Sequence, residues 1–61
     1  MEWVITVLRQ VEGITVPISE IRWSGPLPKN RIMFAKKHGG TQLEIQSLRE
    51  YLDTHEEGYN A

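Results

Sequence analysis

The side chains of this sequence with the clearest chemical potential are basic, and they gather in its middle. Residues 21–43 contain no acidic side chain. The same segment contains five basic residues, which are Arg22, Lys29, Arg31, Lys36 and Lys37. Basic side chains neutralise phosphates, and arginine also reads the edges of bases. Together with Arg9, the segment therefore predicts a nucleic-acid-binding surface, with DNA favoured, and ordinary solvated loop residues are the alternative interpretation.

The carboxyl-terminal segment has the opposite charge. From residue 44 onward, Arg49 is opposed by five acidic residues, which are Glu44, Glu50, Asp53, Glu56 and Glu57. Carboxylates near the end of a helix oppose its dipole, so the last of these acids do not stabilise the helix expected there. We therefore expect the four acids of residues 50–57 to contact a protein partner, with a solvated helix face as the alternative.

Catalytic and metal-binding chemistry is not indicated by the sequence. The chain has no cysteine, which excludes disulfides and thiolate zinc sites. His38 and His55 lack the spacing of a metal-binding pair, and no serine lies in a nucleophile elbow. Gly39 and Gly40 lack the spacing of a phosphate-binding loop. We therefore expect a non-enzymatic protein that has no cofactor and no small-molecule substrate.

The length of the chain predicts one small domain that needs a partner. A chain of 61 residues buries only about 60% of its unfolded surface, so its core is marginal. Without disulfides or a metal, association is the remaining way to stabilise it, and we expect a homodimer or a complex. No apolar run approaches the roughly 18 residues of a membrane span, and no signal peptide is recognisable. We therefore expect a cytoplasmic protein that does not bind membranes.

The first half of the chain is typical of a hairpin. Residues 3–10 and 14–18 are rich in β-branched side chains that alternate, and Gly13 provides a turn between them. The first strand has apolar residues on both faces, which predicts burial on both sides. Pro17 cannot donate to a ladder, so the second strand is an edge or ends there. The apolar phase then changes before Ile21, which a helical turn at Ser19 or a bulge would explain equally well.

The second half predicts a loop, two further short strands and a helix. Residues 24–30 form the loop, and residues 32–35 are expected to be a strand followed by a turn over residues 36–40. A strand through Leu43 and Ile45, then a helix from Leu48 to about His55, is preferred over one helix from residue 42. Ser47 and Glu50 form a capping box, and Gly58 is expected to end the helix. The expected fold is α+β, with about four short strands and one C-terminal amphipathic helix in a domain of residues 1–57, followed by a frayed tail of residues 58–61.

Residues 7–45 resemble the swapped-hairpin DNA-binding proteins of the AbrB-like and MazE-like type. The resemblance rests on a strand, a turn at Gly13, a second strand with Pro17, and a loop over residues 28–31. It implies a short helix over residues 18–23 and a closing hairpin flanked by residues 32–35 and 43–45. In that family, two chains interlock their hairpins and basic residues contact DNA, while an acidic C-terminal segment serves a protein partner.

Two functions follow from these patterns. The first is a nucleic-acid-binding transcription regulator that uses the basic middle segment. The second is a phage or mobile-element inhibitor or adaptor that docks on a host protein. Its hot spot would be the acidic helix or the loop of residues 23–27, where Trp23 and Leu27 are the anchors.

Overall fold

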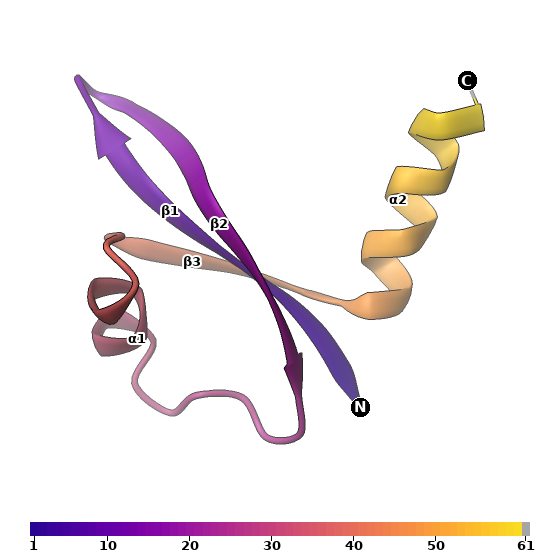
Figure 1. Ribbon diagram of the computed structural model, residues 1–61, viewed down its shortest axis with the longest axis horizontal. Helices are drawn as coiled ribbons and strands as arrows, with labels where there is room; N and C mark the ends of the chain where they lie inside the picture. Colours follow the sequence, from indigo (N-terminus) through magenta and orange to yellow (C-terminus); the bar gives the residue numbers. More distant parts are fainter. Residues whose placement is uncertain (61) are drawn as a thin grey trace.

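The computed structural model describes the backbone of residues 1–60 and the side chains through Thr54. The elements follow one another as β1 (Glu2–Val11), β2 (Ile14–Ser24), α1 (Arg31–Lys37), β3 (Gln42–Ser47) and α2 (Leu48–Asn60). The three strands form one antiparallel sheet in the order β2-β1-β3. Figure 1 shows the two helices on opposite sides of this sheet. The α+β class is confirmed, with three strands and two helices in place of four strands and one helix.

β1 and β2 form the predicted hairpin. Its turn has positive φ angles at Glu12 (51°) and Gly13 (80°), as a type I′ turn requires. Val7 pairs with Ser19 but Leu8 pairs with Pro17, so β2 has one extra residue at position 18. This bulge explains the change of apolar phase. The alternative of a helical turn at Ser19 is wrong, as is the short helix that the family resemblance implies over residues 18–23, because β2 continues to Ser24.

β3 pairs with only part of β1. Its partners in β1 are residues 3–8, so the hairpin beyond them, residues 9–16, projects as a two-stranded ribbon (Figure 1). The preferred interpretation of a strand through Leu43 and Ile45 is confirmed. β1 is the central strand, and β2 is an edge strand, as Pro17 predicts.

Residues 31–37 form α1, so the expected strand over residues 32–35 is wrong. Asn30 caps the helix, since its side-chain oxygen accepts the N–H of Met33 at 3.1 Å. In a strand, Ile32 and Phe34 would share a face, but Ile32 is 65% exposed while Phe34 is half-buried. Ala35 is completely buried, so its side chain marks the inward face of the helix. The strand prediction failed because it used two alternating apolar residues and overlooked the cap and the good helix formers around them.

Among the described residues, the core consists of three residues of β1, on its two faces, and one residue of α1. On one face, Ile5 and Val7 are fully buried, together with Ala35 of α1. On the other face, Val4 is 6% exposed and lies beside α2. Burial of β1 on both sides is therefore confirmed. We call the side with the odd-numbered β1 residues and α1 the α1 face, and the side with the even-numbered residues and α2 the α2 face.

The connection from α1 to β3 presses the backbone against β1. The N–H groups of Gly40 and Thr41 donate to the carbonyls of Ala35 and Leu8, both at 2.8 Å. A Cβ at Gly40 would overlap the side chain of Val7 and the carbonyl of Leu8, so only glycine fits this close approach.

α2 begins where the capping box predicts. The hydroxyl of Ser47 accepts the N–H of Glu50 at 3.2 Å. The helix continues through Gly58, its expected end, to Asn60. Among the described residues, no helix is long and apolar enough to cross a membrane.

Candidate nucleic-acid interface

Most of the predicted basic residues lie on the α1 side of the molecule. Three belong to α1, one to the loop before it and one to β1, and these are Arg31, Lys36, Lys37, Lys29 and Arg9. Because side chains alternate along a strand, Arg9 shares the face of Ile5 and Val7. Its neighbour Leu8 accepts a hydrogen bond from the connection that follows α1, which ties the end of this helix to the base of the ribbon.

The outward surface of α1 combines cations with apolar side chains. Ala35 faces the sheet, Met33 and Lys37 lie opposite it on the helix, and Ile32 and Lys36 lie to one side. Ile32 and Met33 are 65% and 66% exposed, and both lysines are exposed. The lysines occupy the last turn, where positive charge is favourable to the helix dipole. Sequence analysis missed the two apolar residues because it assigned them to a strand, and the Asn30 cap was the signal that places them on a helix.

The acidic residues gather on the other side. Glu20 and Glu44 both pair with Thr6, so they share the α2 face. Glu2 has the same parity in β1, and Glu50 and Asp53 are exposed on α2. Only Glu12, at the tip of the hairpin, lies away from this group among the acids of residues 1–54. The separation of charge along the chain thus becomes a separation between two sides of a sheet.

Arg22 is the basic residue that the fold removes from the others. It pairs with Val4 in the ladder, so its side chain lies on the α2 face. Its guanidinium is 3.9 Å from the carboxylate of Glu2, and the two side chains are 69% and 52% exposed. An exposed pair at this distance contributes little stability. Arg22 is therefore not part of the cationic surface around α1.

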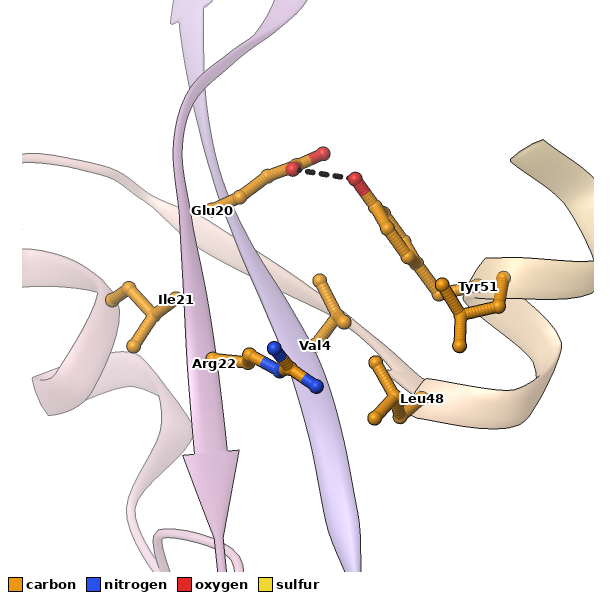
Figure 2. A pocket seen from close by; sticks show the side chains of 7 residues that line it. Val4, Glu20, Ile21, Arg22, Leu48 and Tyr51 are labelled. Carbon is orange, nitrogen blue, oxygen red and sulfur yellow. Dashed lines mark hydrogen bonds between the residues drawn. The ribbon is translucent and has the colours of Figure 1, made fainter. Parts of the chain in front are cut away.

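Beside Arg22 lies a shallow pocket of about 260 Å³ between β2 and α2. Val4, Leu48 and Leu52 are its apolar lining. Figure 2 shows Arg22 and Val4 pointing toward α2, while Ile21 points to the other side of the sheet. The Tyr51 hydroxyl donates to the Glu20 carboxylate at 2.9 Å. This hydrogen bond, followed by burial and by the charge of Glu20, raises the pKa of Tyr51 above its usual value of 10.0.

The loop predicted to be a docking hot spot is held by contacts within the chain. The indole N–H of Trp23 donates to the carbonyl of Pro26 at 2.8 Å. The Trp23 ring meets Phe34 of α1 edge to face, with 5.4 Å between ring centroids. Phe34 in turn packs on His38 at 4.6 Å. Leu27 is half-buried. These contacts give Trp23 a role in holding α1 to β2.

The remaining predicted residues lie on α2. Glu50 and Asp53 are exposed, and Glu56 and Glu57 lie outside the residues whose side chains the structure describes. Across the described residues, no group of three acidic or histidine side chains could hold a metal ion.

Comparisons with known proteins give no match for this chain. No family model fits the sequence, and no curated protein and no solved structure is similar enough to indicate a relationship. The arguments for function therefore rest on the geometry of the molecule.

Proposed function

We propose that the protein is a cytoplasmic nucleic-acid-binding regulator that contacts phosphates through α1, the loop before it and Arg9. The observation that carries the proposal is the separation of charge between the two sides of the sheet. Five basic residues lie around α1, whereas the acids of the described side chains lie on the α2 side or at the hairpin tip. A surface of one sign attracts a polyanion and orients it before contact.

The dimensions of α1 suit a nucleic-acid groove. With its side chains an α-helix is about 10–12 Å across, and the major groove of B-form DNA, about 12 Å wide, admits it. Lys36 and Lys37 would contact phosphates, and Arg31 could reach a base edge. The exposed Met33, opposite Ala35 on the helix, would meet thymine methyl groups, which are the apolar feature of the groove.

The test is binding to labelled double-stranded and single-stranded DNA, measured by fluorescence anisotropy at two salt concentrations. Neutralising five phosphates predicts an affinity loss of about 500-fold between about 50 mM and about 200 mM salt. Preference for the double strand would support the groove geometry. The absence of binding at the lower salt concentration would refute the proposal.

A matched pair of variants tests the location of the surface. Lys36→Glu and Arg49→Glu change the net charge equally, but Lys36 lies on α1 and Arg49 on α2. We expect Lys36→Glu to weaken binding at least about tenfold, and Arg49→Glu to change it less than about twofold. Equal losses would show that binding follows net charge alone.

A second candidate function is docking on a basic protein partner through the α2 side. A groove of about 480 Å³ lies between the amino terminus and α2, and Met1 and Leu52 beside it are 87% and 46% exposed. Exposed Glu50 and Asp53 on the same helix supply complementary charge. Leu52→Asp should abolish capture of such a partner while Lys36→Glu leaves it unchanged, and the opposite pattern would exclude this surface.

A further inference from the structure

β2 is the longer of the two edge strands of the sheet, with 11 residues against 6 in β3. β2 lies at the end of the strand order, and no other strand pairs with its outer side in the part of the chain that the structure describes. Figure 1 looks along the shortest dimension of the molecule, 11 Å. In this view the three strands cross near the middle of the sheet, with α1 to one side of the crossing and α2 to the other. Among the described residues, neither helix covers this edge. A long exposed edge is a template for pairing with another strand.

One end of β2 cannot take part in such pairing. Pro17 has no N–H to donate, and the bulge at residue 18 disturbs the backbone next to it. The regular segment available for pairing is therefore residues 19–24, which remain paired with β1 on their other side.

The hydrogen bonds to β1 determine which groups face outward. The N–H of Gly25 donates to the carbonyl of Met1 at 3.1 Å, in the same register as Glu2 with Ser24. Donors alternate along a strand, so Trp23, Ile21 and Ser19 also face β1. The N–H and C=O groups of Glu20, Arg22 and Ser24 therefore point away from the sheet.

Charge selects one register for the pairing of two copies. A second β2 can add by a two-fold axis perpendicular to the sheet, centred on residue 20, 21 or 22. Centring on Glu20 places two carboxylates opposite each other, and centring on Arg22 places two guanidinium groups opposite each other. Centring on Ile21 places Glu20 of each chain opposite Arg22 of the other, on the same face. Opposite charges stabilise a cross-strand pair and like charges destabilise it.

We infer that the occupant of the β2 edge is a second copy of this chain, paired antiparallel about Ile21. Glu20 and Arg22 then form backbone-bonded pairs, and the two Ile21 residues meet on the α1 face. One Glu20 oxygen accepts from Tyr51 in the same chain, and the carboxylate retains a second oxygen for the incoming guanidinium. Arg22 gives up only its long, exposed contact with Glu2.

The resulting dimer has a continuous six-stranded sheet. The perpendicular axis keeps both α1 helices on one face, so the cationic surface of one chain lies beside that of the other. The pairing follows from the β2 edge alone and does not rest on the proposed function. Binding to DNA and dimer mass can therefore fail independently.

Charge exchange tests the pairing by light scattering or sedimentation over a range of concentrations. Glu20→Arg and Arg22→Glu should each weaken the dimer about tenfold, because each creates two like-charge pairs. The double variant Glu20→Arg/Arg22→Glu should restore it. Two controls should leave the dimer unchanged. Glu44→Arg makes the same charge change on the other edge strand, and Tyr51→Phe removes the hydrogen bond from Tyr51 to Glu20. A monomer up to about 1 mM, or a dimer insensitive to these changes, would overturn the inference.

Cross-linking tests the register. The chain has no cysteine, so an introduced one is unique. In Ile21→Cys, the two Cα atoms face each other at about 4.5 Å, within the reach of a disulfide. In Ser24→Cys, on the same strand, they are separated by about 20 Å. We expect Ile21→Cys to form the disulfide rapidly and Ser24→Cys not to form it. The register would be refuted if Glu20→Cys or Arg22→Cys oxidised faster than Ile21→Cys, or if Ser24→Cys oxidised equally fast.

Discussion

The two sides of the sheet differ in how completely they are closed. On the α1 face, Ile5, Val7 and Ala35 have no exposed surface, and Phe34 packs against Trp23. On the α2 face, Val4 is the only buried residue among the described side chains, and open pockets remain on either side of Leu48. α1 completes a core and leaves a smaller pocket of about 180 Å³ beside β3, whereas α2 leaves pockets of about 260 Å³ and about 480 Å³.

The cause is the way each helix is attached. α1 lies between two strands, and the connection after it bonds to β1 through Thr41 and approaches Val7 at Gly40. α2 follows the last strand and is attached at its beginning, through Leu48 and the bond from Tyr51 to Glu20. An element fixed at both ends provides a rigid base for a cationic surface. Within its described residues, α2 leaves Glu50, Leu52 and Asp53 exposed.

The largest expected effect is on the free energy of unfolding, when the same valine-to-alanine substitution is made on each side of the sheet. Val7→Ala removes two methyl groups from the closed side and should lower the free energy of unfolding by about 2 kcal/mol. Val4→Ala makes the same change on the open side, where neighbours can adjust, and should cost about half as much. Urea denaturation followed by circular dichroism measures both. Equal costs would show that the two sides are packed equally well.

Removing the helix caps should also affect the two sides differently, with a smaller change in the free energy of unfolding. Asn30→Ala removes the cap of α1 and should lower the free energy of unfolding by about 1 kcal/mol. Ser47→Ala removes the cap of α2 and should mainly increase hydrogen exchange within that helix, with less effect on global unfolding. If Ser47→Ala lowered global stability more than Asn30→Ala, the proposed difference between the helices would be wrong.

The smallest effect concerns the bond between the α2 helix and the sheet, and it depends on pH. The pKa of Tyr51 is raised in the folded protein because its neutral hydroxyl donates to Glu20. This contribution to stability is therefore complete below the unfolded pKa of about 10 and is lost as pH rises through the higher folded pKa. Tyr51→Phe should be slightly less stable at neutral pH and should lose less stability in alkali. Parallel denaturation curves from about pH 8 to about pH 11 would test this, and identical pH dependence in both proteins would contradict it.

Local patterns were sufficient for the hairpin and for the start of α2. Each of these signals depends only on residues that are close together in the sequence. They are a glycine at a positive φ, the alternation of apolar residues, and a serine–glutamate cap. The apolar pattern by itself was insufficient for α1, because a short apolar run such as residues 32–35 fits a strand or a helix equally well, and only the Asn30 cap favours the helix locally. Packing of Ala35 against the sheet decided between them, and it depends on residues distant in the sequence.

The charges show the same division between sequence and tertiary structure. The sequence by itself determined that cations occupy the middle of the chain and acids its end. Only the tertiary structure decided that Arg9 lies on the side of α1 while Arg22 lies on the side of α2. The physical reason is that strand side chains alternate between faces, and the face that meets each helix is set by long-range pairing and packing. The opposition of Glu20 and Arg22 across a two-fold axis likewise depends on which edge of β2 the sheet leaves free.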